Sequence, residues 1–269
     1  MTDPRVQAHR TIRVAGGSRE TLEDSVAVER ALDMRVNGRP LAVTLRTPGN
    51  DEELALGFLA GEGILQRPAE VAAVELRAGS CADEPDVAEI TLAPGVSFDW
   101  TRLERHFAAT AACGLCGRAH LESLRAGLRP IDAGAPLDAA SLLELPGRLR
   151  EAQAAFQVTG GLHAAALLDG RLTLEVLRED VGRHNAVDKV AGWLLGQGRY
   201  PASSGVLWVS GRAGAEIVLK AARARIPVLA AVGAPSSLAI ELAEAATMTL
   251  VGFLREGRMN VYSGAQRLG

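Results

Sequence analysis

The last third of the chain alternates short apolar segments with helix-like segments, and this alternation constrains the fold more than any other feature. Residues 206–209, 227–232 and 249–254 have the length and composition of buried strands, and helical spacing follows the first two. Strand–helix–strand units form parallel sheets through right-handed crossovers, and parallel strands are covered on both faces. The pattern predicts an α/β fold with a mainly parallel stretch of sheet.

Polar residues and glycine follow these predicted strands where the chain turns. They are Ser210, Gly211 and Arg212 after the first strand, Ser236 and Ser237 after the second, and Arg255 and Arg258 after the third. Open α/β sheets bind ligands at the carboxyl ends of their strands, and helix N-termini beside arginines suit phosphates. Serine is also an ordinary helix cap. Together, the residues favour a site for a phosphorylated or nucleotide-like ligand.

The first part of the chain predicts a smaller unit. Strand-like segments at 24–29, 32–36, 41–45, 71–77 and 86–92 surround one helix. We expect Asn37-Gly38 to form a hairpin turn and Asn50 to cap the helix, whose acidic start (Asp51, Glu52, Glu53) is interpreted as solvated. The polar residues 1 to about 20 are expected to be frayed. This divides the chain into a small α+β domain, 1–110, and an α/β domain, 111–269.

Residues 179–190 predict a helix with Asp180 as its cap. His184, Asn185 and Asp188 then share one face beside a buried stripe. Two interpretations stay open: a functional set of polar groups, or a satisfied His184–Asp188 pair at i, i+4.

Composition indicates a soluble protein. The net charge is −3, from 29 basic and 32 acidic residues, and gives no basic bias typical of a nucleic-acid partner. No apolar run reaches the length of a membrane span, and no signal-peptide core stands at the start. Three cysteines in 269 residues fit a reducing cytoplasm, so we expect a cytoplasmic protein that binds neither nucleic acid nor membrane.

Two of those cysteines, Cys113 and Cys116, stand three residues apart between glycines and are followed by Arg118. Glycines expose the sulfurs, while a helix start and a nearby guanidinium favour the thiolate. The pattern indicates a reactive thiol pair on a loop.

Three other interpretations of the pair stay open. Half of a structural zinc site would need a second cysteine or histidine pair, and Cys81 and the five histidines are scattered. A thioredoxin-type pair follows a strand, whereas helix-like sequence precedes this one. Inert buried thiols would not need exposing glycines. We therefore expect no permanent metal.

Five segments together resemble the FdhD family of formate dehydrogenase accessory sulfurtransferases. They are TPGNDEELALGF with EG (47–58 and 62–63), CGLCG (113–117), TGGLHAA (159–165), EDVGRHNAVDK (179–189) and VGFLREGR (251–258). They run through nearly the whole chain in order, and the fourth is highly specific.

The resemblance implies a sulfur carrier. A cysteine desulfurase would load sulfur on Cys113, and we expect Cys116 to assist because a vicinal thiolate can attack a persulfide. The protein would then pass the sulfur to a molybdenum cofactor, the bis-guanine-dinucleotide form, before its insertion into formate dehydrogenase. The family's cofactor-binding segment falls on Phe253, Leu254, Arg255, Glu256, Gly257 and Arg258. We add His184 and the strand-end residues to this site, and expect GDP to mimic the cofactor's dinucleotide ends.

The resemblance also implies a homodimer and a larger domain similar to the cytidine deaminase fold. Deaminase chemistry itself needs H-x-E followed by P-C-x-x-C, whereas Ala164 and Ala165 follow His163 and the cysteine pair precedes it. A thiol–disulfide oxidoreductase and a non-catalytic cofactor-binding chaperone remain the alternative functions.

Overall fold

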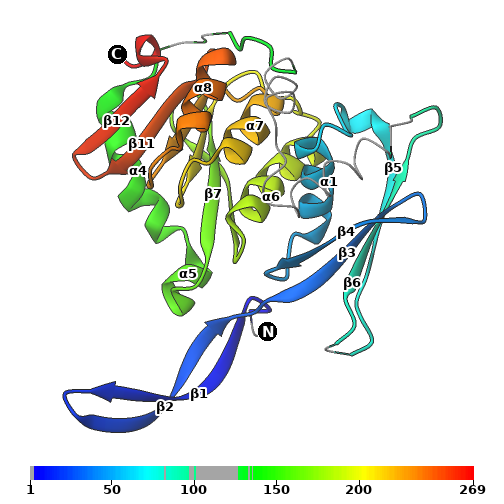
Figure 1. Cartoon of the computed structure of the whole chain (residues 1–269), viewed down its shortest axis with the longest axis vertical. Coiled ribbons are helices and arrows are strands. Elements are labelled where there is room, and N and C mark those ends of the chain that lie inside the picture. The colour runs from blue at the N-terminus through cyan, green and yellow to red at the C-terminus, as the bar shows by residue number, and fades with distance from the viewer. Residues whose placement is uncertain (1–2, 82, 97–99, 101–126, 133, 135) are drawn as a thin grey trace.

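The computed structural model describes residues 3–81, 83–96, 100, 127–132, 134 and 136–269, which form three separate sheets (Figure 1). Two of them pack with helices, and the third is a two-stranded arm. The mixed α/β class predicted from the sequence is confirmed. Within the described residues no helix is long and apolar enough to cross a membrane.

The largest sheet has six strands in the order β12-β11-β10-β9-β7-β8. Its strands are β7 (His163–Leu168), β8 (Leu174–Asp180), β9 (Val206–Val209), β10 (Val228–Ala231), β11 (Thr249–Arg255) and β12 (Arg258–Ser263). The predicted parallel stretch is confirmed, since β9, β10 and β11 pair in parallel, while β7 and β12 run antiparallel to their neighbours. The carboxyl ends of β8, β9, β10 and β11 therefore point to one edge, which we call the strand edge.

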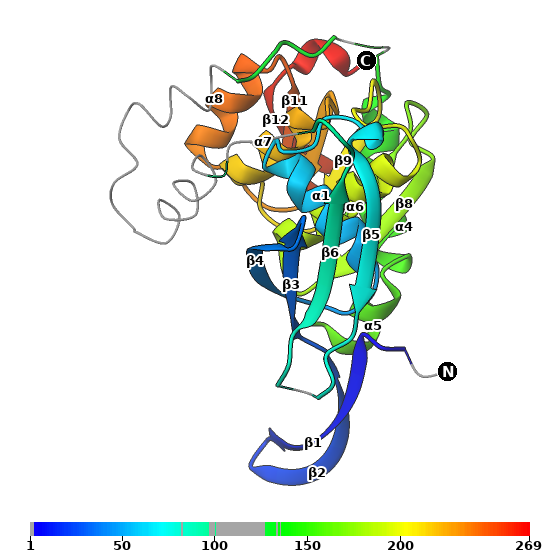
Figure 2. The same ribbon diagram turned by 90° about the vertical axis from the view of Figure 1, so that its right-hand side faces the viewer.

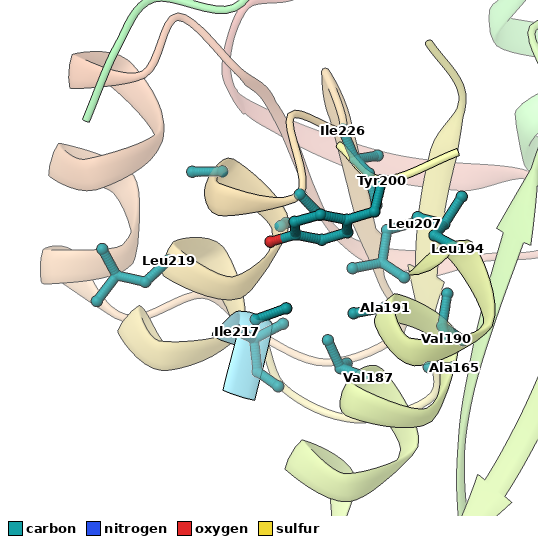
Figure 3. Close-up of a cluster of buried hydrophobic side chains, with 14 of the residues drawn as sticks. Ala165, Val187, Val190, Ala191, Leu194, Tyr200, Leu207, Ile217, Leu219 and Ile226 are labelled. Atoms are coloured by element: carbon teal, nitrogen blue, oxygen red, sulfur yellow. The ribbon is translucent and has the colours of Figure 1, made fainter. Parts of the chain in front are cut away.

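Helices cover both faces of this sheet. On one face lie α6 (Arg183–Gly196), α7 (Ala215–Arg223) and α8 (Ser237–Ala245), whose apolar side chains pack with alternate strand residues such as Ala165 and Leu207 (Figure 3). The intervening residues, such as Ala164 and Trp208, turn to the other face and pack with α4 (Ala139–Glu151). This two-residue alternation produces two cores from one sheet. The short helix α5 (Ala154–Thr159) leads into β7, and η2 (Ala265–Arg267) ends the chain.

The second sheet has four strands in the order β4-β3-β6-β5. It contains β3 (Arg30–Val36), β4 (Arg39–Arg46), β5 (Val71–Arg77) and β6 (Asp86–Leu92), with α1 (Asp51–Gly61) and η1 (Pro68–Glu70) between β4 and β5. The predicted turn between β3 and β4 is confirmed: Asn37 and Gly38 both have positive φ, 50° and 78°, as a tight hairpin requires.

Helix α1 joins this sheet to the rest by packing on α6 through two glycines. An ideal Cβ on Gly57 would lie 1.7 Å from the carbonyl oxygen of Asp188, and one on Gly192 would lie 1.8 Å from that of Glu53. The two backbones therefore touch, and one core cluster runs from β3 and α1 into α6 and α7. The predicted domain boundary near residue 110 falls outside the described residues and stays a prediction.

The N-terminal segment forms an arm, so the expectation of a frayed start is wrong. Strands β1 (Val6–Ala15) and β2 (Ser18–Ala27) pair over ten residues and project away from the body (Figures 1 and 2). Gly16 and Gly17, with φ of 55° and 82°, make the turn. At its base Arg5 donates a hydrogen bond to Glu179 (2.9 Å).

Candidate functional site

The loops that follow β9 and β10 and the end of β11 lie side by side at the strand edge. The amide of Gly233 donates to the carbonyl of Gly211 (2.9 Å), and the amide of Phe253 donates to the carbonyl of Gly233 (3.1 Å). An ideal Cβ on Gly233 would lie only 2.9 Å from the Gly211 oxygen. This close backbone packing brings the three predicted turns together.

The predicted serines differ in what their hydroxyls do. The Ser210 hydroxyl accepts a hydrogen bond from the Ala164 amide (2.9 Å), and that of Ser236 accepts one from the Ala239 amide (3.2 Å) and caps α8. These oxygens stabilise the loops. Arg212, Ser236 and Ser237 are exposed, and of these three Ser236 already uses its hydroxyl as the cap of α8.

The segment Phe253–Arg258 comprises the end of β11, the turn at Glu256 and Gly257, and the first residue of β12. Phe253 has φ of 52° and is 37% exposed, whereas Leu254 is fully buried in the core under α4, so only its backbone can contact a ligand. Arg255 and Arg258 are cross-strand partners and both are exposed.

The tip of this turn leans toward α4. Glu256 Oε1 would lie 3.4 Å from a Cβ on Gly147 in that helix, and Gly257 supplies the positive φ (74°) of the turn. Helix α4 covers the opposite face of the sheet from α7 and α8. The tip of this turn and the N-termini of α7 and α8 therefore lie on opposite sides of the strand edge.

His163 and Arg183, which were not among the predicted site residues, lie at the same edge. An ideal Cβ on Gly211 would lie 3.5 Å from His163 Nδ1 and 3.7 Å from Arg183 Cδ. Burial and the positive charges of Arg183 and His184 lower the pKa of His163. The sequence signal that could have found this histidine is its position just after Gly160-Gly161, where a turn leads into the apolar strand β7.

The predicted helical cap is wrong, and so is the His184–Asp188 pair, one of the two interpretations left open for this face. Helix α6 begins after Gly182, and Asp180 is the last residue of β8. His184 Nε2 instead lies 3.0 Å from Glu216 Oε2 on α7, and this hydrogen bond lowers the pKa of Glu216. Asp188 is buried and pairs with Lys220 on α7 (2.6 Å), while burial raises its pKa.

The other polar residues of segment 179–189 stabilise the fold. Asp180 pairs with Lys189 (2.7 Å), and the Asn185 amide donates to the carbonyl of Leu45 (2.8 Å) and to Asp180 (3.0 Å). Within that segment, Arg183 and His184 are thus the polar side chains that could contact a ligand at the strand edge.

The acidic start of α1 is not simply solvated. Asn50 does precede the helix, without a side-chain cap bond, and Glu52 is exposed. Asp51 and Glu53 instead pair with Arg46 (2.7 Å) and Arg178 (2.5 Å). These ion pairs tie α1 to β4 and β8.

Cys113 and Cys116 lie outside the described residues, so their predicted thiol chemistry stays a prediction. Cys81 is an exposed free thiol. Among the residues that the structure describes, no group of three or more histidine, cysteine or acidic side chains could hold a metal ion.

Comparison with known proteins gives close relatives over the whole chain. The chain is 48% identical over 268 residues to the sulfur carrier protein FdhD of Streptomyces avermitilis, covering 97% of this chain and 95% of that protein. It is 47% identical to the protein of the same name from Mycolicibacterium paratuberculosis, with 97% of each chain covered.

A solved structure has the same fold. It is the crystal structure of a Desulfotalea psychrophila protein named for an accessory function in formate dehydrogenase, with a TM-score of 0.78, 24% identity, and coverage of 99% of this chain and all of that one. The model of the FdhD/NarQ family matches residues 27–269. The chain therefore belongs to the FdhD/NarQ family.

Proposed function

We propose that this protein is a cytoplasmic sulfurtransferase that carries sulfur as a persulfide on Cys113. A cysteine desulfurase supplies the sulfur, and the acceptor is a molybdenum cofactor, the bis-guanine-dinucleotide form, bound as a substrate at the strand edge before its insertion into formate dehydrogenase. The sulfur carrier names of its relatives support the sulfur-carrying half. We further propose that the protein works as a homodimer and that its α/β part is similar to the cytidine deaminase fold.

The proposal that the strand edge binds the sulfur acceptor depends on one observation, the positive charge of the side chains there. Arg212, Arg255 and Arg258 are exposed there, and within the described residues none has an ion pair with an acidic side chain. A guanine dinucleotide carries a diphosphate, and arginines bind phosphate oxygens with two parallel hydrogen bonds. The amides that begin α7 and α8 add partial positive charge beside them.

The two cysteines of the pair can both load the sulfur and release it. In loading, the Cys113 thiolate attacks the outer sulfur of the desulfurase persulfide, and the desulfurase cysteine leaves as a thiolate. In release, the Cys116 thiolate attacks the inner sulfur of the Cys113 persulfide, and the outer sulfur leaves as hydrosulfide. The two cysteines are oxidised to a disulfide while the released sulfur is reduced. A cellular thiol must then reduce the disulfide before the next cycle.

The testing experiment is mass spectrometry of the full-length protein after incubation with a cysteine desulfurase and cysteine. We expect a gain of about 32 Da, one sulfur atom, on the peptide containing Cys113. Cys113→Ala should abolish this gain, and Cys81→Ala, which removes the exposed thiol outside the pair, should leave it unchanged. An adduct that persists on Cys81 or Cys116 in the Cys113→Ala protein contradicts the assignment.

Mass spectrometry and a maturation assay together separate the two alternative functions. A thiol–disulfide oxidoreductase would form a reversible Cys113–Cys116 disulfide with a protein substrate and would gain no sulfur. A non-catalytic chaperone would support formate dehydrogenase maturation in a Cys113/Cys116 double mutant.

A further inference from the structure

His163 and Arg183 come together at the strand edge although they are 20 positions apart in sequence. His163 is the first residue of β7 and faces Asp180, the last residue of β8, across the ladder. Arg183 is the first residue of α6. Gly211, in the loop after β9, places its α-carbon against both side chains, so that an ideal Cβ would lie 3.5 Å from the imidazole and 3.7 to 3.8 Å from the arginine stem.

The Arg183 side chain carries a permanent positive charge, and Asp180 and Glu216 interact with the pair through their charges without bonding to it. His163 and Arg183 are both partly buried, and within the described residues neither donates a hydrogen bond nor forms an ion pair. A partly buried guanidinium loses hydration and gains nothing in return unless an anion binds it. The burial, together with Arg183 and His184, lowers the pKa of His163, so its ring is neutral at neutral pH.

The acidic groups near the pair are already engaged. Asp180 lies 2.7 Å from the Lys189 ammonium, and Glu216 lies 3.0 Å from His184. The charged and titratable groups that act on His163 are Asp180 on β8 and Arg183 and His184 on α6, and Glu216 on α7 acts in turn on Arg183 and His184.

We propose that His163 and Arg183 together bind the diphosphate of a nucleotide, and that His163 takes up a proton as the diphosphate binds. This inference rests on the proposed function, because it assigns the pair to one dinucleotide end of the same substrate. The guanidinium supplies the permanent charge, and the imidazolium that forms supplies a second charged donor beside the amides at the start of α6.

The sign of the pH dependence follows from linkage. A bound anion stabilises the charged imidazole, so the pKa of His163 is higher in the complex than in the free protein. Between these two pKa values the protein takes up a proton on binding, and the affinity therefore rises as the pH falls. A pKa rise of about one unit makes the complex about tenfold tighter at low pH than at high pH.

The test is calorimetry of the full chain with diguanosine diphosphate, in which both ends of the diphosphate are esterified. This probe has no phosphate group that titrates near neutral pH, whereas the terminal phosphate of GDP does. Titrations in two buffers with different enthalpies of ionisation count the protons taken up. For wild type we expect uptake of a fraction of one proton, and an affinity that falls severalfold between about pH 6 and pH 8.

Three variants test which side chain takes up the proton and which binds the diphosphate. His163→Gln should bind with no proton uptake and with the same affinity at both pH values. Arg183→Gln should weaken binding at both. His9→Gln, which removes an exposed histidine of the arm, should keep the wild-type proton uptake. Histidine NMR adds a readout that does not need a variant to fold, since the pKa of His163 should rise on addition of the probe.

The outcomes separate this inference from the proposed function. Binding of the probe and of GDP with no proton uptake, or the same uptake by His163→Gln, overturns the inference and leaves the nucleotide site standing. No binding of either nucleotide to wild type overturns both.

Discussion

The ammonium nitrogen of Lys189 lies 2.7 Å from a carboxylate oxygen of Asp180, and both side chains are almost completely buried. The same loop of the four-stranded part holds both groups: Lys189 donates to the carbonyl of Thr47 (2.9 Å), and the amide of Thr47 donates to Asp180 (3.2 Å). Burial lowers the pKa of Lys189, against the opposing effect of Asp180. The pair thus fixes the start of α6, where Arg183 and His184 face the strand edge.

Removing one member of this pair should be costly. Lys189→Met leaves the Asp180 carboxylate buried without its counter-ion, so we expect the free energy of unfolding to fall by about 3–5 kcal/mol in urea titrations. The control is Arg67→Ala, which removes a largely exposed partner of Glu70 and should cost less than about 1 kcal/mol. Equal losses in the two variants would show that Lys189 does not stabilise the fold through a buried charge.

The contact between α1 and α6 predicts opposite effects for alanine at two glycines of one helix. A Cβ at Gly192 would meet the Glu53 backbone at 1.8 Å, so Gly192→Ala should lower the free energy of unfolding by about 1–3 kcal/mol or more. A Cβ at Gly196, the last residue of α6, would meet nothing within 4 Å. Gly196→Ala should raise stability by about 0.5–1 kcal/mol, the helix preference for alanine. Thermal unfolding of the pair is the measurement, and a stabilised Gly192→Ala protein would contradict the packing.

Asp86 should make stability depend on acid pH. Burial alone would raise its pKa, but hydrogen bonds from Arg46 and the Gly79 amide, with the charge of Arg30, hold it below the usual value. A lowered pKa stabilises the fold above the unfolded value, and the effect is lost as the pH falls through the folded one. Wild-type unfolding free energy should therefore decline below about pH 4.

Asp86→Asn tests this dependence. The variant should be less stable than wild type at neutral pH and should lose less stability on acidification, measured by urea titration at each pH. Glu52→Gln, an exposed change at the start of α1, should keep the wild-type acid slope. A slope in Asp86→Asn equal to that of wild type would remove Asp86 as a source of the acid sensitivity.

Arg258→Ala should weaken GDP binding by about 1.5–3 kcal/mol, the range for a hydrogen bond to a charged group. GDP should raise the melting temperature of wild type through binding to the folded state, and calorimetry should give the affinities. Sulfur loading on Cys113 should be unchanged, because the proposed sulfur donor acts on the cysteine pair. Arg77→Ala, an exposed change on β5, is the matched control and should bind GDP as wild type does.

Much of the fold could be predicted because apolar patterning and turn residues are local signals. The strands at 71–77 and 86–92, the Asn37-Gly38 hairpin and the parallel order of β9, β10 and β11 all follow from such signals. The arm could not be predicted from the same signals, because little packs against either of its faces. Its strands alternate polar with apolar residues only weakly, and Ile12 and Val14 are exposed.

The candidate site was predictable only in part. The order of strands and helices was enough to place Ser210–Arg212 and Ser236 at one edge, since parallel strands end together. The partners of His184 and Asp188 lie on α7, and helical periodicity gives the face of a residue but not the element that meets it. For the same reason the meeting of His163 with Arg183 could not be predicted, because it depends on the antiparallel pairing of β7 with β8 and β9.

The glycine contact between α1 and α6 also bears on how the molecule can move. Packed helices slide past one another by shear when the interdigitated side chains between them change rotamer. At Gly57 and Gly192 there is no such side-chain layer, because each backbone rests on a carbonyl of the other helix. The four-stranded sheet and the six-stranded sheet should consequently behave as one rigid body. Any displacement of the strand edge during sulfur transfer then has to come from its loops, such as the turn of Gly257, and not from a hinge between the sheets.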